Sequence, residues 1–333
     1  MPRAGDVHLL TAAPPAPPGD VTALPGEFDS VSELLVGWHA DAWSYLPVYA
    51  TLVREASKRS RVVVLLAEQD EEDFVRFHLA AAGADMGAVD LVYAPLDSVW
   101  IRDYGPLVVR THSRRPRAID LPYDRSDDDR VPGVLAARSG WAVSNPPIQM
   151  DGGHLQSDGT GRCIASDDLI WLNGELGISE GEVRAALRDY LGCRQLYFVP
   201  AFVDEATGHL DLMLYVTAPG RVLVGRYRQW QDRENGRRLD ETAKILETAG
   251  FEVARIPMPG NQGRRIFRSY TNALAFNDVV FVPVYKRDRR WERRALRAFR
   301  GAFPDRTIIP VEADEVMEMG GAIHCITMTV ASP

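Results

Sequence analysis

The chain has 333 residues, of which 46% are hydrophobic and 25% charged, a composition typical of a globular protein that can bury a core without disulfides. Its formal net charge of −8 disfavours broad binding to nucleic acid. No stretch approaches the ~18 apolar residues of a membrane span and the first residues lack the apolar core of a signal peptide, so we expect a cytoplasmic protein with neither nucleic acid nor membrane as partner.

Strand and helix patterns alternate along the chain after a start that is rich in Pro and Ala. That start covers residues 12–26, and we expect residues 1–26 to form a flexible arm. Ser179 and Glu182 form a capping box, and the helix that it opens is expected to end at Gly192. The other predicted elements are strands at 34–38, 61–67 and 89–94 and helices at 48–59, 70–82, 242–249 and 291–301. This alternation indicates an α/β protein.

Charge clusters and cysteines have ordinary structural explanations. The acidic run at 124–130 predicts a solvated loop. The basic stretch at 286–300 predicts an exposed helix face, with contact to RNA or an acidic partner as the alternative. Cys163, Cys193 and Cys325 include no CxxC pair, which argues against a disulfide framework and a structural zinc site. No glycine-rich phosphate motif occurs, so no nucleotide cofactor is expected.

The segment 100–106 (WIRDYGP) places a carboxylate beside a turn. A strand is expected to lead in, and Gly-Pro forces the chain to turn, which puts Asp103 at a strand end. The alternative is a surface ion pair between Arg102 and Asp103, with Trp100 in the core.

The segment 208–214 (GHLDLML) combines an imidazole with a carboxylate. Alternate residues of a strand point to the same face, so His209 and Asp211 are expected side by side, opposite a leucine face. A general acid/base with a carboxylate neighbour and a pair of metal ligands both fit. A half-exposed strand with two polar residues is the structural alternative.

The segment 320–327 (GGAIHCIT) sets a cysteine between apolar neighbours. Such a cysteine is typical of a core, but Gly320 and Gly321 allow a ligand or backbone to approach closely. Strand alternation places His324 and Cys325 on opposite faces, so Cys325 needs a base from elsewhere in the chain.

Two further segments hold polar residues in apolar or turn-like surroundings. Asn272 interrupts a strand-like run at 268–274 and needs a hydrogen-bond partner if it is buried. Asp151 opens the sequence DGGH, which resembles a tight turn that holds another carboxylate.

In this order, the motifs WIRDYGP, DGGHLQSDGTGRC, GHLDLM, RSYTNALAFNDVVFVPVY and GGAIHCITM resemble the agmatine deiminase and bacterial peptidyl-arginine deiminase family. The likeness runs from about Gly26 to Thr329. It implies the pentein fold of the guanidine-modifying superfamily, a five-bladed α/β propeller of ββαβ units with the active site in its central channel. Residues 27–333 would then form one catalytic domain.

The resemblance also assigns roles to individual positions. Cys325 matches the nucleophile, His209 the general acid/base, and Asp211 and Asp103 the carboxylates that grip the guanidinium. Asn272 matches a catalytic-site asparagine. The positions implied to bind substrate are Trp100, Arg102, Asp151 and Gly321.

The implied chemistry suits these residue types. Two carboxylates can hold a planar guanidinium through charge-assisted hydrogen bonds and place its carbon over Cys325. Release of ammonia through a covalent thiouronium then gives a ureido product, without cofactor or metal. The two carboxylates are also expected to raise the pKa of Cys325 above about 8.5.

Three positions depart from the agmatine deiminase pattern. The chain reads GGAIHCITMT in place of GGGNIHCITQQ, Tyr104 in place of Thr, and His154 in place of Asn. The first two changes look more like peptidyl-arginine deiminases, so the partner is a cationic guanidine, either agmatine or arginine in a peptide.

Other classes of protein remain open. They are an amidinotransferase, a metal-dependent hydrolase that uses His209, Asp211 and Asp103, and a non-catalytic protein that binds guanidines. The assembly state is also open, a homodimer included.

Overall fold

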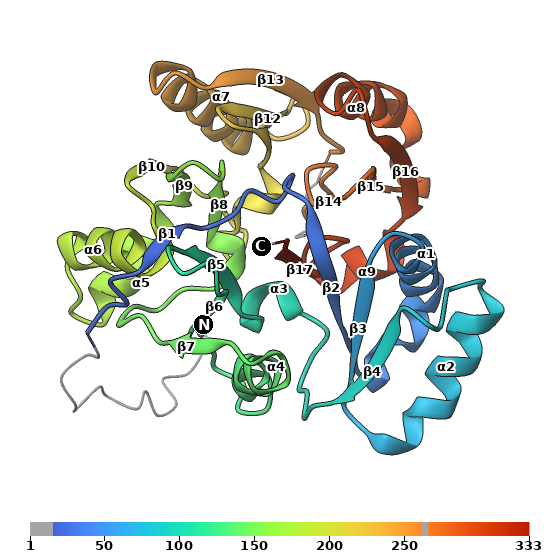
Figure 1. The fold of residues 1–333 in the computed structure, drawn as a ribbon. Coiled ribbons are helices and arrows are strands. Elements are labelled where there is room, and N and C mark those ends of the chain that lie inside the picture. Colours follow the sequence, from blue (N-terminus) through green and yellow to red (C-terminus); the bar gives the residue numbers. More distant parts are fainter. Residues whose placement is uncertain (1–15, 261–265, 333) are drawn as a thin grey trace.

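The computed structural model describes residues 16–260 and 266–332, and its strands form five separate sheets. Figure 1 shows the five sheets around a common centre, with most of the helices outside them. Among the described residues, no helix is both long enough and apolar enough to cross a membrane.

Each sheet combines an antiparallel strand pair with a parallel pair. In spatial order, the sheets are β1 (Val21–Ala23), β5 (Leu107–Thr111), β6 (Arg117–Ile119) and β7 (Ala142–Ser144); β10 (Gln195–Val199), β9 (Arg162–Ser166) and β8 (Leu155–Ser157); β11 (Leu214–Ala218), β12 (Arg221–Arg226) and β13 (Glu252–Pro257); β14 (Leu274–Phe276), β15 (Val279–Val284) and β16 (Thr307–Glu312); and β17 (Met328–Ala331), β2 (Val31–Trp38), β3 (Arg61–Leu66) and β4 (Val89–Tyr93). In the third sheet, for example, β11 and β12 are antiparallel and β12 and β13 are parallel. The same order of pairings recurs in the other four.

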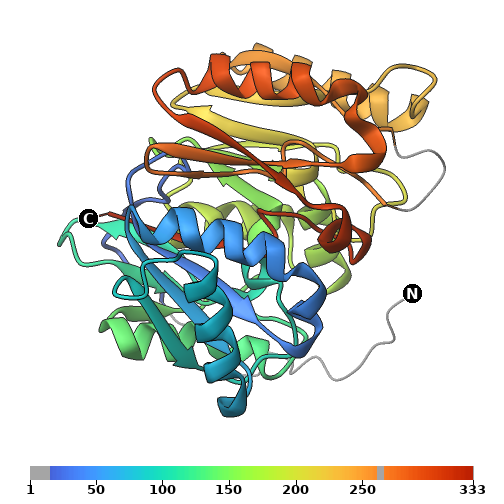
Figure 2. The ribbon, with the colours of Figure 1, turned by 90° about the vertical axis from the view of Figure 1, so that its right-hand side faces the viewer.

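Helices span the parallel crossovers, as parallel strands require. Their bounds are α1 (Leu46–Ser57), α2 (Glu72–Ala81), α4 (Val131–Ser139), α5 (Asp168–Glu175), α6 (Glu180–Leu191), α7 (Arg233–Thr248) and α8 (Arg289–Ala302), with the short α3 (Ile101–Tyr104) and α9 (Asp314–Glu318) in connections between sheets. Figure 2 shows α1 and α2 on the outer side of their sheet and α8 along another edge of the molecule.

The α/β class and the main predicted elements are confirmed. The strand predicted at 61–67 is β3, and the capping box of Ser179 and Glu182 opens α6, which Gly192 ends with a left-handed φ of 69°. The helix predicted at 242–249 is only the second half of α7. The basic stretch at 286–300 forms most of α8, with Trp291, Ala295, Leu296 and Phe299 buried on its inner face.

Two expectations about side chains are wrong. Cys163 and Cys193 form a disulfide, because the parallel pairing of β9 and β10 and the end of α6 bring them together in the core. The acidic run at 124–130 is not wholly solvated, since Asp128 is buried and accepts hydrogen bonds from the backbone N–H and the hydroxyl of Ser98.

The predicted arm is only partly within the described residues. Residues 1–15 lie outside them. Val21–Ala23 forms β1 and pairs antiparallel with β5, so the chain is held in a sheet before residue 26.

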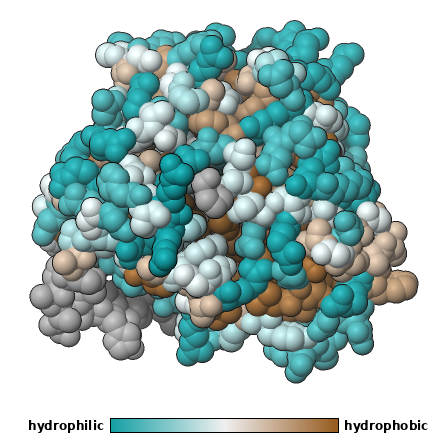
Figure 3. Space-filling view, viewed as in Figure 1, coloured by the Kyte–Doolittle hydropathy of each residue, from teal (hydrophilic) through white to brown (hydrophobic). Residues whose placement is uncertain are grey.

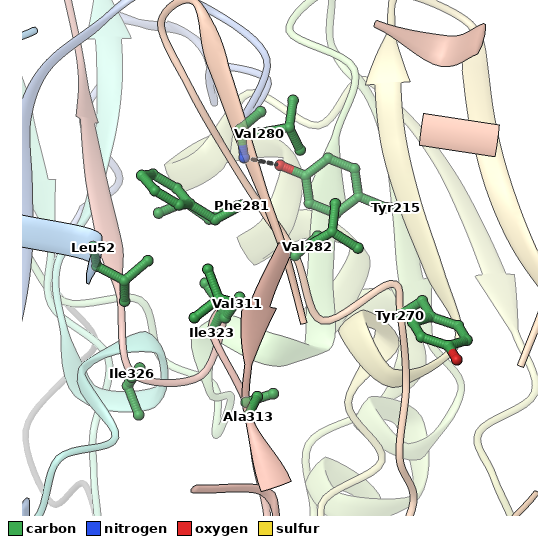
Figure 4. Packing of buried hydrophobic residues seen from close by; sticks show 14 of the residues in the cluster. Leu52, Tyr215, Tyr270, Val280, Phe281, Val282, Val311, Ala313, Ile323 and Ile326 are labelled. Carbon is green, nitrogen blue, oxygen red and sulfur yellow. Dashed lines mark hydrogen bonds between the residues drawn. The ribbon is translucent and has the colours of Figure 1, made fainter. Parts of the chain in front are cut away.

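The core extends to the segment that carries Cys325. Ile323 and Ile326 are fully buried and pack in the same apolar cluster as Leu52, Phe281 and Val311 (Figure 4). A cysteine between two such anchors has little freedom to move.

Candidate active site

The predicted site residues all lie in connections that lead from one sheet to the next. The described residues of these connections are 94–106, 145–154, 200–213, 258–260 with 266–273, and 313–327. Asp103, Asp151, His209, Asn272 and Cys325 each come from a different one. Because the sheets surround a common centre (Figure 1), side chains that are far apart in sequence meet there.

Asp103 and Asp211 lie in short helical turns, so the strands expected around them are wrong. Asp103 belongs to α3, where the N–H of Gly105 donates to the carbonyl of Ile101 at 2.8 Å. Asp211 lies in the middle of the 3-10 turn η5 (Leu210–Leu212), and this turn begins directly after His209. Asp211 and His209 still both face the centre, because each contacts other site residues there.

Residues 323–326 form a turn, and the strand β17 begins only at Met328. The carbonyl oxygen of the Asn272 side chain accepts hydrogen bonds from the N–H groups of Ala322 (3.1 Å) and His324 (2.9 Å). Because the segment turns, His324 and Cys325 both reach buried polar partners, and the expectation that they occupy opposite faces is wrong. Asn272 has the partners that its burial requires.

Two glycines give the reacting side chains their space. A Cβ on Gly321 would lie 2.7 Å from Cys325 Cβ and 2.7 Å from an atom of the Trp100 ring. A Cβ on Gly153 would lie 2.4 Å from His209 Nδ1. Larger residues at these positions would displace the cysteine or the histidine.

Cys325 is buried and has two polar neighbours. Its Sγ lies 3.4 Å from Asp211 Oδ2 and accepts a hydrogen bond from Asn272 Nδ2 at 3.0 Å. Burial, together with Asp211 and Asp103, raises the pKa of the Cys325 thiol well above its usual range. The predicted direction is confirmed, although burial is the first cause.

Asp211 starts a buried chain of charged groups. His324 Nδ1 donates to Asp211 Oδ2 at 2.6 Å, and His324 Nε2 donates to both oxygens of Glu27 at 2.8 and 2.7 Å. Arg102 Nη1 donates to Glu27 at 2.7 Å. Against the effect of burial, Arg102 and then His324 lower the pKa of Glu27 to about 2.

His209 lies between two further carboxylates. Its Nε2 is 3.4 Å from Asp151 Oδ2, and its Nδ1 is 3.7 Å from Asp103 Oδ1. Burial opposes the charge of His209, but Asp103 and Asp151 raise its pKa to about 10. Burial raises the pKa of Asp103 to about 7. The imidazole is therefore protonated at neutral pH.

His154 and Tyr104, which depart from the agmatine deiminase pattern, occupy different places. His154 packs edge-on against His209, with ring centroids 4.8 Å apart, and burial followed by His209 lowers the pKa of His154 to about 4. Tyr104 is buried and its hydroxyl donates to the carbonyl of Ser98 at 3.0 Å. His154 thus belongs to the site, while Tyr104 supports the segment behind it.

Trp100 and Arg102, which are implied to bind substrate, also lie in different surroundings. Trp100 is half-buried and lies against Gly321, beside Cys325. Arg102 is only 3% exposed and pairs with Glu27, so its charge already has a partner in the protein.

Glu27 and His324 were not predicted as site residues. His324 could have been found from its position next to Cys325. The assumption of a strand, however, placed the two side chains on opposite faces. Glu27 stands in the sequence PGEFD, which carries no pattern that points to a site.

One group in the site could hold a metal ion. Ligand atoms of Asp151, His154 and His209 all lie within 4.8 Å of one another, the only such group within the described residues. A tetrahedral metal could use these ligand types.

Comparison with known proteins shows the family of this chain. Residues 23–331 match the family described as Porphyromonas-type peptidyl-arginine deiminase. The chain belongs to this family. A Vibrio parahaemolyticus protein provisionally named agmatine deiminase is 26% identical, over 94% of this chain and 98% of its own length.

Solved structures of family relatives share the fold. Agmatine deiminase of Enterococcus faecalis superposes with a TM-score of 0.80 at 20% identity, covering 92% of this chain and 95% of its own. A Cys→Ser variant of C. jejuni agmatine deiminase with substrate bound gives a TM-score of 0.81 at 19% identity, covering 94% and 96%.

Proposed function

We propose that this family member is a deiminase that hydrolyses the guanidinium group of an arginine-derived substrate to a ureido group and ammonia. One observation carries the proposal. Asp103 Oδ1 and Asp211 Oδ1 are buried and have no hydrogen-bond partner among residues 16–260 and 266–332, and both carboxylates contact the residues that would react. Buried acceptors without donors are costly, and a guanidinium supplies the missing N–H groups in a planar array.

The charge of the site fits a monovalent cation. When all groups are ionised, the carboxylates Glu27, Asp103, Asp151 and Asp211 outnumber the cations Arg102, His209 and His324 by one. One guanidinium balances that excess. Its charge would also offset the groups that hold the Cys325 pKa high, so substrate binding promotes the thiolate.

The reaction then follows from the side chains. The Cys325 thiolate attacks the guanidinium carbon, and protonated His209 gives its proton to the leaving ammonia. A covalent thiouronium remains on Cys325. His209, now neutral, takes a proton from water as the water attacks. The C–S bond then breaks and restores the thiolate, and the hydroxyl of the intermediate loses its proton to give the neutral ureido product, so that ammonia and this proton together leave as ammonium.

We also propose an arrangement for the five sheets. We take the five sheets as blades of one propeller and residues 27–333 as a single catalytic domain, to whose first sheet β1 adds a strand from before residue 27. The recurring order of strand pairings and the shared fold of agmatine deiminases support it.

The test measures ammonia and ureido release from agmatine, free arginine and a short arginine peptide, for wild type and Cys325→Ala. Turnover of one substrate that disappears in the variant supports the proposal and identifies the substrate. A folded wild type that binds guanidines but releases no ammonia from any of the three would contradict deimination. Amine-dependent consumption without ammonia would indicate amidino transfer instead.

A further inference from the structure

The hydrogen bonds of His324 define its charge. Both ring nitrogens face carboxylates, Nδ1 toward Asp211 and Nε2 toward Glu27. An ionised carboxylate only accepts hydrogen bonds, so both nitrogens must donate. Only the imidazolium form of His324 satisfies both neighbours at once.

The charged groups around His324 come from four segments. Glu27 and Asp211 favour its positive charge, while burial and Arg102 oppose it, and the pKa of His324 is raised overall. The ring of Tyr215 lies edge-on at 6.4 Å, and Cys325 follows His324 in the chain. Without Glu27, the main support for the imidazolium on the side away from the site is lost.

The hydrogen bond from His324 uses only one oxygen of Asp211. Oδ2 accepts from His324 and lies near Cys325, while Oδ1 has no hydrogen-bond partner in the part of the chain that the structure describes. A carboxylate held through one oxygen presents the other in a fixed direction.

The chain of charges ends at Glu27 and Arg102, which both line a cavity. Glu27 and Arg102 line this cavity together with residues of β1, β5, β8 and β17 or next to them, among them Leu24 and Met328. Figure 3 shows hydrophobic residues that reach the surface near the middle of the face that it draws. The Glu27 side chain keeps 17% of its surface exposed, whereas His324 keeps 1%.

We propose that Glu27 and His324 are positioning residues that hold Asp211 as a guanidinium acceptor, with Glu27 acting only through the imidazolium of His324. The inference rests on the proposed function, because it assigns Asp211 to the substrate. It gives a role to a carboxylate that touches neither Cys325 nor His209 within the contacts of the described residues.

The test compares Glu27→Gln, Glu27→Asp and His324→Asn with wild type. Glu27→Gln removes the charge that offsets Arg102, so the pKa of His324 should fall toward or below about 6.5. Above that pH the ratio of wild-type to variant kcat/KM should grow with pH, through a higher KM, because the neutral ring no longer holds Asp211 with a positive charge. Glu27→Asp keeps the charge and should show no such growth.

His324→Asn supplies a neutral N–H near the position of His324 Nδ1. It should raise KM to a similar degree at every pH, because no proton is left to lose. Thermal melting checks that each variant is folded, and recovery of Glu27→Gln near pH 6 serves as its internal control. A loss of kcat/KM that is the same from pH 6 to 9 in folded Glu27→Gln would overturn the proposal and indicate a structural role.

Nitrogen NMR of the His324 ring separates this inference from the proposed function. Wild type should show imidazolium at pH 8, and Glu27→Gln should show neutral imidazole, whether or not a substrate turns over. A neutral ring in wild type at pH 7 would overturn the inference even if deimination is confirmed.

Discussion

The disulfide between Cys163 and Cys193 gives a stability prediction with a defined size. The two cysteines are 30 residues apart and both are buried. Closing a loop of this length in the unfolded chain contributes about 3.5–4 kcal/mol at 25 °C in the chain-entropy account. For 333 residues, that corresponds to a fall in Tm of about 5 °C on reduction.

The assay is urea unfolding with and without reductant, allowed to reach equilibrium because the bond is buried. It is done in the Cys325→Ala background, so that the disulfide is the only group that responds to reductant. A Cys163→Ala/Cys193→Ala variant in that background is the matched control, and its midpoint should not move. Thiol titration of the urea-unfolded wild type should find one free thiol before reduction and three afterwards.

A fall in the free energy of unfolding of less than about 1 kcal/mol on reduction would refute this prediction, because it is well below the usual range for such a loop. An equally strong response of the control variant would refute it too. In that case the reductant acts elsewhere.

The remaining predictions concern the site. Gly321→Ala should lower kcat/KM at least about tenfold by crowding Cys325 and Trp100, whereas Gly301→Ala, with open space around it, should have no effect on activity. Asp103 has a raised pKa of about 7, so kcat/KM should rise with pH through about 7 as it ionises. Because the folded state binds this proton more tightly, protonated Asp103 should stabilise the fold at low pH, and this stabilisation should decline toward pH 7. Asp103→Asn should remove the decline in unfolding experiments. Iodoacetamide should label resting Cys325 slowly at neutral pH and faster as pH rises; rapid labelling at pH 7 contradicts the raised pKa. Dialysis against a chelator should leave turnover unchanged; loss of activity that returns with metal would assign Asp151, His154 and His209 to a metal-dependent reaction.

Local sequence patterns predicted the α/β class and the main helices and strands, and they named most residues of the candidate site. The apolar run of β3 and the caps of α6 depend on neighbouring residues, so their bounds could be predicted within a few positions. The motifs were recognisable as short strings, and their residues do meet in the structure. Their local conformation was misjudged because alternation was read as strand in segments that are turns.

Contacts between distant segments could not be predicted. Glu27 reaches His324 across 297 positions, and no periodic pattern links them. The same holds for the disulfide, which depends on how α6 returns to the edge of β10. Such pairings follow from the arrangement of whole sheets, which propensity and spacing do not encode.

The sheet that contains β17 also contains β2, β3 and β4, so the strand just after Cys325 pairs with one near the start of the chain. During synthesis, every other site residue emerges from the ribosome before the nucleophile and its anchoring strand. The enzyme should therefore acquire activity in a single late step, when β17 pairs with β2. Nascent chains that stop before β17 would carry all five connections, Cys325 included, but would lack the strand that anchors the last of them, and should be inactive.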